Sequence, residues 1–285
     1  MTTLLCGQRE LSLATPQIMG VLNVTPDSFS DGGTLYRSDR LNPDLLLARA
    51  EQMAADGAAI LDIGGESTRP GATPVTLDEE RDRVLTAVEL IANRLDVVIS
   101  VDTSSPEIMA ESASIGAGLL NDVRAFSRAG ALEAAGLSGL PVSVMHMPAE
   151  PDTMQAKTDY SDVVVEVFAY LGGRIDACIN AGIDRSKIVI DPGFGFGKTV
   201  EQNYQLLARL SEFKALGLPI LVGLSRKSMI GAITGRPADQ RVTPSAVLAV
   251  LAAERGATIV RVHDVAETRD ALDVWAATLG GGDGS

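Results

Sequence analysis

The sequence contains few cysteines and few histidines, two of each in 285 residues. Cys6 and Cys178 lie far apart in the chain, which favours a reducing compartment, the cytoplasm. No cysteine follows a predicted strand, no serine elbow is present, and only His146 and His263 could act as bases. The sequence therefore does not indicate a nucleophile system of the Ser-His or Cys-His kind. Closely spaced ligands for a structural zinc are missing as well.

Positive charge is scarce too. The chain has 24 Lys and Arg against 37 Asp and Glu, a net charge of −13, which argues against non-specific binding to nucleic acid or to an anionic membrane. Its longest strongly apolar run, residues 246–253, is far too short to span a bilayer, and the N-terminus lacks the basic and apolar regions of a signal peptide. We therefore expect small-molecule substrates, and a local basic cluster for any anionic ligand.

Short apolar runs alternate regularly with amphipathic segments along the chain. We predict strands near residues 18–24, 58–63, 97–103, 118–122, 141–146, 187–191, 219–224 and 258–263. Helices are predicted near residues 43–56, 77–94, 106–115, 129–137, 161–181, 201–216, 243–255 and 266–278. Eight alternating units of this kind predict an α/β fold, a parallel (β/α)8 TIM barrel, with an open doubly wound sheet as the alternative.

Two further features concern the ends of the chain. Residues 3–13 read as two short strands around Gly7 and Gln8, a β-hairpin expected to cover one end of the core. No Pro-, Gly- and Ser-rich linker divides the chain, so residues 1–279 are predicted to form a single catalytic domain. Residues 280–285 are predicted to be a disordered tail.

The stretch 188–199, IVIDPGFGFGKT, presents Asp191 at the end of a buried strand, before a loop rich in glycine. Without side chains at the glycines, a flat ligand could approach the loop, with Phe194 and Phe196 as apolar walls. A phosphate-binding loop does not fit, because that pattern needs glycine where Pro192 stands, and the dinucleotide pattern needs it at Lys198. The alternative for Asp191 is a helix cap.

Polar residues end every predicted strand, which in a barrel places them around one rim. Each alone could be a helix cap, a solvated helix start or, for His146, a satisfied interior histidine. Together they suggest two functions. A phosphate or pyrophosphate, alone or with a divalent metal, would suit Asn23, Arg69, Arg261 and His263, with Lys227 nearby. A planar heterocycle would suit Asp102, Asn121 and Asp191, with Lys227 on the other side.

The strand-end segments resemble the motifs of the dihydropteroate synthase family in order and spacing, from about residue 17 to residue 275. The matching segments are MGVLNVTPDSFSDGG, DIGGESTRPGA, SVDTS, LLNDVR, MHM, IDPGFGFGKT, VGLSRKS and RVHDV. The resemblance implies a (β/α)8 barrel that joins 6-hydroxymethyl-7,8-dihydropterin pyrophosphate to p-aminobenzoate in folate biosynthesis, releasing pyrophosphate and 7,8-dihydropteroate. It also implies a sulfonamide target, commonly a homodimer formed through barrel helices.

Residue roles follow from the resemblance position by position. It implies a pterin pocket of Asp102, Asn121, Asp191 and Lys227, with walls formed by Met145, Phe196 and Gly223. It implies that Asn23 contacts the magnesium ion, Mg2+, and that Arg69, Arg261 and His263 hold the pyrophosphate. The p-aminobenzoate site would include Thr68, Pro70, Phe29 and Ser228. The residues expected to matter most for catalysis are Lys227, Arg261, His263 and Asp102.

This chemistry agrees with a dissociative substitution, because a pterin can delocalise positive charge on its exocyclic methylene while pyrophosphate departs. One departure from the family concerns positions 148 and 149, where Pro148 and Ala149 replace the usual Gln and Gly, and Pro148 should stiffen that loop. Three alternatives remain: a corrinoid methyltransferase with a related barrel, a Schiff-base aldolase using Lys227, and a pterin-binding paralogue without activity.

Overall fold

A computed structural model describes residues 3–25, 35–37, 40–66, 75–150 and 153–280. Its centre is a sheet of eight parallel strands in the order β10-β9-β8-β7-β6-β3-β12-β11. The strands are β3 (Gln17–Asn23), β6 (Ile60–Gly64), β7 (Val98–Asp102), β8 (Leu119–Asp122), β9 (Val142–Met145), β10 (Ile188–Asp191), β11 (Leu221–Val222) and β12 (Ile259–Val262). A parallel bridge between Ile190 and Ile220 joins the two edges of the sheet. The predicted (β/α)8 barrel is confirmed, and the open sheet is excluded.

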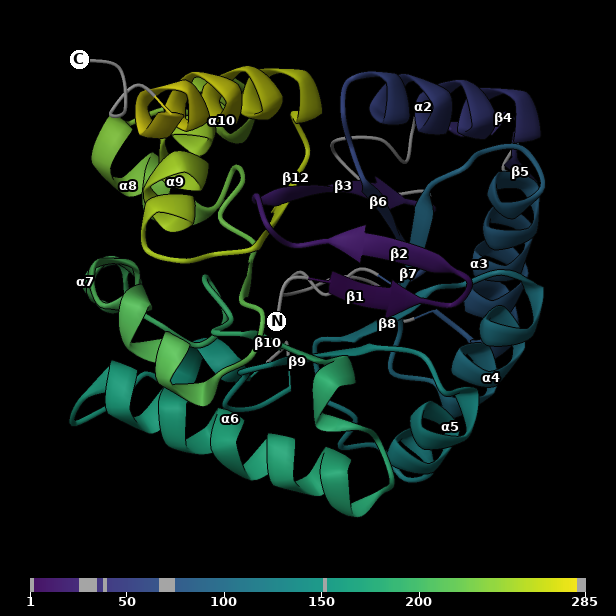
Figure 1. Cartoon of the computed structure of the whole chain (residues 1–285), viewed down its shortest axis with the longest axis horizontal. Helices are drawn as coiled ribbons and strands as arrows, with labels where there is room; N and C mark the ends of the chain where they lie inside the picture. The colour runs from purple at the N-terminus through teal and green to yellow at the C-terminus, as the bar shows by residue number, and fades with distance from the viewer. Residues whose placement is uncertain (1–2, 26–34, 38–39, 67–74, 151–152, 281–285) are drawn as a thin grey trace.

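Helices surround the barrel as a ring (Figure 1). They are α2 (Pro43–Ala55), α3 (Leu77–Ala92), α4 (Pro106–Ile115), α5 (Ala131–Ser138), α6 (Val163–Asn180), α7 (Val200–Ala208), α8 (Ser228–Thr234), α9 (Val242–Glu254) and α10 (Val265–Gly280). Short 3-10 helices are η1 (Met154–Ala156), η2 (Arg185–Lys187), η3 (Leu210–Leu216) and η4 (Ala238–Gln240), and β4 (Tyr36–Arg37) pairs with β5 (Arg40–Leu41). None of the described helices combines the length and apolar character needed to cross a bilayer.

Two helices differ from the sequence prediction. The segment predicted as one helix over 201–216 is α7 followed by the 3-10 helix η3. Helix α8 was not predicted, because its seven residues are too few to show a helical apolar period. Helix starts agree better with local sequence: Thr76 caps α3 and Thr199 caps α7, each in a reciprocal capping box.

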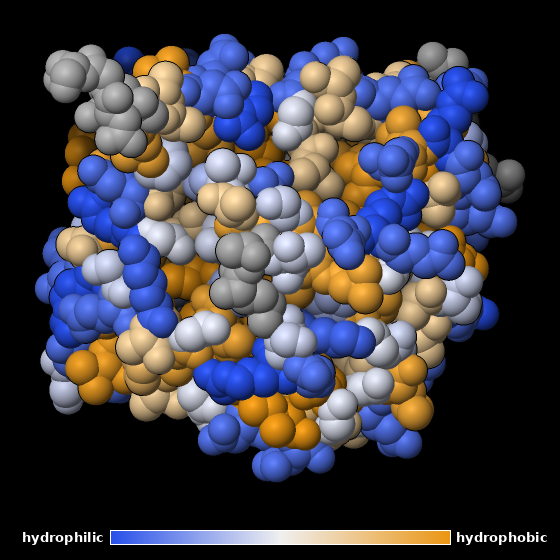
Figure 2. Space-filling view, viewed as in Figure 1, coloured by the Kyte–Doolittle hydropathy of each residue, from blue (hydrophilic) through white to orange (hydrophobic). Residues whose placement is uncertain are grey.

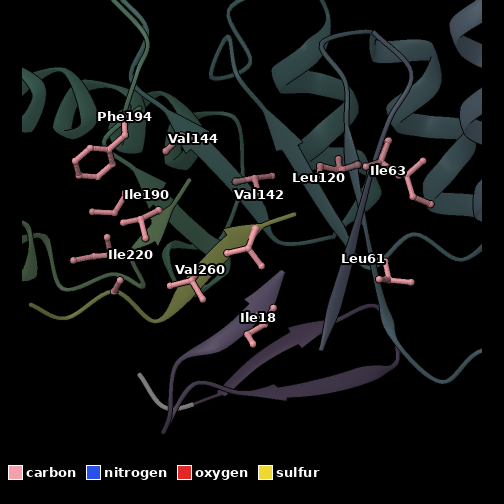
Figure 3. Packing of buried hydrophobic residues seen from close by; sticks show 14 of the residues in the cluster. Ile18, Leu61, Ile63, Leu120, Val142, Val144, Ile190, Phe194, Ile220 and Val260 are labelled. Carbon is pink, nitrogen blue, oxygen red and sulfur yellow. The ribbon is translucent and has the colours of Figure 1, made fainter. Parts of the chain in front are cut away.

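Outward-facing strand residues form the layer between the barrel and its helices. Figure 3 shows side chains of this layer, which come from alternate positions of the strands and pack in the main hydrophobic core. The labelled members of this layer that lie on strands are Ile18, Leu61, Ile63, Leu120, Val142, Val144, Ile190 and Val260. The strands are apolar on their outer face and also, near the amino-terminal end of the barrel, on their inner face. Their sequences are therefore continuous apolar runs.

The predicted N-terminal hairpin is also confirmed. Strands β1 (Thr3–Cys6) and β2 (Arg9–Ser12) pair antiparallel and lie across the middle of the ring of helices (Figure 1). Hydrophobic side chains of the hairpin segment contact those inside the amino-terminal end of the barrel: Leu4, Cys6, Leu11 and Leu13 pack with Met19, Ile60, Val98, Leu119, Val189, Leu221 and Ile259. On this face of the molecule, hydrophobic residues lie among hydrophilic ones (Figure 2). The hairpin therefore closes the end of the barrel opposite the predicted site.

Candidate active site

The barrel interior changes from apolar to polar within two residues along six of the eight strands. Residues i and i+2 face the same side of a strand. The residues two positions after the inner apolar layer therefore also face the barrel interior. The polar inward positions are Asp62, Ser100, Asn121, Ser143, Asp191 and Arg261, whereas Val21 on β3 and Gly223 after β11 are not polar. The carboxyl ends of the strands thus enclose a polar, largely buried site, as the sequence predicted.

Arg261 is the centre of one half of this site. Its Nε donates to Asp62 Oδ2 at 2.6 Å and its Nη2 to Asp102 Oδ2 at 2.9 Å. Asp62 is fully buried and also accepts from Ser100 Oγ at 2.6 Å and from Asn121 Nδ2 at 3.3 Å. The predicted residues Asp102, Asn121 and Arg261 are therefore brought together.

Asp62 connects these residues, although none of the predicted roles involves it. The available signal was its position inside an apolar strand, because a buried carboxylate there needs a cation or donors nearby. Burial, and then the adjacent Asp62 carboxylate, raise the pKa of Asp102, while Arg261 opposes that shift. One guanidinium shared by two carboxylates leaves Asp102 able to carry a proton closer to neutral pH than an ordinary aspartate.

Asp191 occupies the other half. It is 6% exposed, and burial raises its pKa to about 6 against the opposing effects of the Gly193 N–H and of Lys227, Lys198 and Arg261. The Gly193 N–H donates to Asp191 Oδ1 at 2.8 Å. The next helix is capped by Thr199, so the interpretation of Asp191 as a helix cap is wrong. Asp191 and Arg261 lie on the same rim, close enough to interact electrostatically.

Lys227 reaches this half from the segment after β11. Its Nζ lies 4.1 Å from the centroid of the Phe196 ring, a cation–π contact. A Cβ on Gly195 would stand 2.8 Å from Lys227 Cδ, so glycine is needed there to admit the lysine stem. Burial lowers the pKa of Lys227 to about 8, and Asp191 opposes the shift.

The backbone before Lys227 has an unusual conformation. Arg226 has φ +57°, a left-handed value that is uncommon outside glycine. Its guanidinium pairs with Asp264 through two contacts, of which Nε to Oδ2 is 2.9 Å. This bidentate pair holds the segment that carries Lys227 against the one that carries His263.

The glycine loop itself differs from the expectation in one respect. Phe194 is 1% exposed and packs in the main core (Figure 3), so its prediction as a wall of the ligand site is wrong. Phe196 lies with the apolar group formed by Val123, Met145, Met147 and Met154, beside Lys227. Met145 and Phe196 thus lie where the predicted walls were expected.

The remaining predicted residues lie around the same rim where the structure describes them. Ser225 Oγ is 3.0 Å from His263 Nδ1 and accepts from the His263 backbone N–H at 3.2 Å. A Cβ on Gly223 would be 4.0 Å from the Arg261 Cβ, and Ser228 is exposed at the start of α8. Predicted residues outside the described part are Phe29, Thr68, Arg69 and Pro70.

Asn23 ends β3 next to Asp102. A Cβ on Gly64 would be 3.4 Å from Asn23 Oδ1 and 3.7 Å from the Asp102 Cβ, so both side chains lie over this glycine. Within the described residues, no three His, Cys, Asp or Glu side chains form a metal-binding group. An amide oxygen near a carboxylate suits Mg2+ that is bound mainly through substrate phosphates and water.

Arg124 is a second residue that the sequence analysis did not single out. Its side chain is 6% exposed and pairs with Glu66 at 3.2 Å and Glu150 at 2.8 Å, while Nη1 donates to Ser104 Oγ at 3.0 Å. These partners follow β6, β9 and β7, so one guanidinium connects three loops of the rim.

Pro148, which replaces the Gln usual in the family, packs against Gly197. A Cβ on Gly197 would come within 2.3 Å of the Pro148 Cγ.

Comparison with known proteins identifies the family. Residues 19–263 match the family described as "Pterin binding enzyme". A dihydropteroate synthase of Haemophilus influenzae is 51% identical over 268 residues, covering 94% of this chain and 96% of that protein.

Two solved structures share the fold over nearly the whole chain. The Yersinia pestis dihydropteroate synthase, in a sulfonamide drug complex, has a TM-score of 0.94 at 49% identity and covers 98% of this chain and 100% of its own. The Xanthomonas albilineans enzyme with 4-aminobenzoic acid has a TM-score of 0.90 at 47% identity, with 98% of each chain covered. The chain therefore belongs to the pterin-binding enzyme family, in its dihydropteroate synthase branch.

Proposed function

We propose that this chain joins 6-hydroxymethyl-7,8-dihydropterin pyrophosphate to p-aminobenzoate, giving 7,8-dihydropteroate and pyrophosphate. The observation that carries the proposal is the convergence of two carboxylates, an amide, a lysine and an arginine at one barrel rim, in a chain 51% identical to a dihydropteroate synthase. These polar groups are Asp102, Asn121, Asp191, Lys227 and Arg261. The proposal needs both the converging polar groups and the sequence identity, because the barrel fold alone occurs in enzymes with many different activities.

The pterin binds between the two halves of the rim in this proposal. Asp191, held by Gly193 and facing Lys227, accepts hydrogen bonds from the paired N–H groups of the heterocycle. Asp102 and Asn121 contact its opposite edge, and Phe196 with Met145 form the apolar wall. A bicyclic ring with donors on one edge fits this set, since each buried polar group then keeps a partner.

The leaving group lies toward Arg261, His263 and Asn23. The Arg261 guanidinium is shared by Asp62 and Asp102, and the pyrophosphate would be an additional anion for this arginine to contact. Asn23 would hold Mg2+ together with the pyrophosphate oxygens and water. The bound ion would offset negative charge on the leaving group.

Little acid or base strength is required of the protein in a dissociative substitution. Departure of pyrophosphate breaks the C–O bond and leaves positive charge delocalised over the pterin and its methylene carbon. The amine of p-aminobenzoate then attacks that carbon and releases one proton to water. Asp191 and the buried carboxylates around Arg261 favour a cationic ring, while the apolar wall of Met145 and Phe196 limits access of water. The residues thus act by positioning and by electrostatics.

Three finer assignments complete the proposal. The p-aminobenzoate site includes Ser228 together with Phe29, Thr68 and Pro70, and Arg69 contacts the pyrophosphate. We infer a homodimer formed through the barrel helices. We also infer a cytoplasmic location, supported by the free, buried thiols of Cys6 and Cys178, whose pKa values burial raises to about 12 and about 11.

The decisive experiment is an assay of pyrophosphate release with both substrates, with and without Mg2+ and a sulfonamide. Release should require both substrates, depend on Mg2+ and be reduced by the sulfonamide. Arg261→Lys keeps the charge for Asp62 and Asp102, and it should raise the KM of the pterin pyrophosphate by about tenfold while changing that of p-aminobenzoate little. Release without p-aminobenzoate, or transfer of a methyl group from methyltetrahydrofolate to a corrinoid protein, would contradict the proposal.

The alternative of a Schiff-base aldolase is tested at Lys227, whose pKa burial lowers to about 8. Borohydride treatment in the presence of a carbonyl substrate should label Lys227 in that case. We expect no label, because the Nζ lies over the Phe196 ring and faces Asp191, an arrangement that favours an ammonium group.

A further inference from the structure

Lys198, at the end of the glycine loop, carries a buried ammonium group. The residue is 5% exposed, and its Nζ lies 2.9 Å from His146 Nδ1 and donates to the Gly193 carbonyl at 2.8 Å and to the Phe196 carbonyl at 3.0 Å. An ammonium has three N–H groups, so all of its donors are used. None of the three acceptors is a carboxylate, which is unusual for a buried lysine.

His146 is fixed as an acceptor for this lysine. Burial, and then the Lys198 charge, lower the pKa of His146 to about 2, so its ring is neutral. A protonated Lys198 can only donate, so Nδ1 is the acceptor of this contact and the ring proton is assigned to Nε2. The ring also packs edge-on to Tyr170 at 4.8 Å and near Tyr160 at 6.1 Å between centroids. His146 is therefore an interior histidine whose Nδ1 is engaged by Lys198.

The other two acceptors connect Lys198 to the pterin site. Gly193 donates its N–H to Asp191, and its backbone approaches the His146 carbonyl so closely that a Cβ would lie 1.9 Å from that oxygen. Phe196 carries the ring beneath the Lys227 ammonium. Lys198 thus holds both the residue that binds the Asp191 carboxylate and the residue that forms the apolar wall.

Charge provides a second link between Lys198 and Asp191. The charged groups that act on Asp191 are Lys227, Lys198 and Arg261, in that order of effect, beside the Gly193 N–H. Conversely, burial lowers the pKa of Lys198 to about 7, and Asp191 opposes that shift. Two lysines on different segments therefore favour ionisation of one buried carboxylate.

We propose that Lys198 is a positioning residue of the pterin site: its ammonium fixes Asp191 and Phe196 in place and supports the negative charge of Asp191. This inference rests on the proposed function only in naming the heterocycle as a pterin. Lys198 does not touch the substrate in this proposal, because its three donors are engaged by the protein.

The test compares Lys198→Met, which removes the charge at similar size, with Lys198→Arg, which keeps it in another shape. Binding of 6-hydroxymethylpterin alone is followed by quenching of its fluorescence across pH 5–8, and KM is measured for both substrates. Lys198→Met should weaken pterin binding about tenfold or more at neutral pH, by loss of charge-assisted hydrogen bonds, and leave the KM of p-aminobenzoate within about twofold. The acid limb of pterin binding should move to higher pH. Lys198→Arg should keep that limb and lose affinity through geometry.

Lys187→Met is the matched control, since Lys187 also donates to a backbone carbonyl, that of Gly139 at 2.7 Å, but on the exterior. It should bind the pterin as the unchanged chain does. If Lys198→Met does not fold, His146→Leu, which removes one acceptor of the ammonium, should weaken pterin binding several-fold with the KM of p-aminobenzoate unchanged.

Normal pterin affinity with an unmoved acid limb in a folded Lys198→Met protein would overturn the proposal. So would equal increases in both KM values, which indicate a merely structural role. Because the binding arm needs no turnover, failure of the unchanged chain to release pyrophosphate would count against the proposed function and not against this role of Lys198.

Discussion

The two ends of the barrel interior are built from the same strands and differ in every property that matters for function. At the amino-terminal end, hydrophobic residues pack against the hairpin, and Met19, Ile60 and Leu119 are fully buried. Two residues further along the same strands, Asp62 and Asn121 line a polar site with Arg261. On β6 and β8, a residue that stabilises the fold and a residue that lines the site thus lie only two positions apart.

This separation explains how the chain tolerates so much buried charge. Burying ions costs free energy, and Arg261, Asp62 and Asp102 offset one another only in part. The apolar layer, the hairpin and the outer core provide the stabilisation that permits it. Changes at the polar end should therefore affect turnover most, and changes at the apolar end should affect the free energy of unfolding most.

Among these changes, Asp191→Asn should have the largest effect, and the quantity affected is the catalytic activity. The substitution keeps the size of the side chain but leaves Lys227 and Lys198 without their buried carboxylate. We expect kcat/KM to fall by roughly 100- to 1000-fold, the equivalent of about 3 to 4 kcal/mol, with a melting temperature that changes little. Steady-state kinetics and thermal melting measure the two quantities, and near-normal turnover would contradict the assignment of Asp191.

Leu4→Ala tests the opposite end. Leu4 is 1% exposed in the hairpin, and its truncation should lower the free energy of unfolding by about 2 to 4 kcal/mol without changing kcat/KM at temperatures where the protein is folded. Its neighbour Leu5 is 52% exposed and provides the matched control, because Leu5→Ala should change stability by less than about 0.5 kcal/mol. Denaturant unfolding gives the values. A loss of activity in folded Leu4→Ala would show that the two ends are coupled.

The pH dependence of pterin binding follows from Asp191. Its pKa is raised to about 6, so the carboxylate that accepts the pterin N–H groups is lost as the pH falls through that value. The dissociation constant of 6-hydroxymethylpterin should rise about tenfold for each pH unit below about 6. Fluorescence titration measures it, and Asp191→Asn should lose this limb.

The raised pKa of Asp191 affects the stability of the fold in the direction opposite to its effect on pterin affinity. Folded Asp191 binds its proton more tightly than the unfolded chain does, so this group favours folding at low pH, and its contribution is lost as the pH rises to about 6. Affinity for the pterin and the stability contribution of Asp191 should therefore change in opposite directions between about pH 4 and pH 6.

Most of the fold could be predicted because its signals are local. Buried strands read as short apolar runs, and glycines with positive φ follow the helices at positions such as Gly116 and Gly256. Helix α8 could not be predicted, since its position depends on packing against α7 and not on a period in its own seven residues. The short strand β11 was overestimated for a related reason, because apolar residues continue beyond the paired ones.

The site could be predicted only in part. Residues at strand ends converge in any barrel, so Asp191 and Arg261 could be placed from sequence alone. Lys198 and Arg124 could not, because their roles depend on partners far away in sequence: His146 is 52 residues from Lys198, and Glu66 is 58 residues from Arg124. Such contacts leave no pattern in the local sequence, and a lysine or arginine is usually predicted to be exposed to solvent.

The smallest effect should come from an exposed ion pair of the hairpin. Arg9 Nε pairs with Asp96 at 2.8 Å, linking β2 to the segment after α3, but the Asp96 side chain is 95% exposed. Water and salt screen such a pair, so Arg9→Gln should change the free energy of unfolding by less than about 1 kcal/mol and leave turnover unchanged. Comparison with Leu4→Ala by denaturant unfolding would then show which contacts hold the hairpin. A larger loss for Arg9→Gln than for Leu4→Ala would mean that charge, and not apolar packing, closes this end of the barrel.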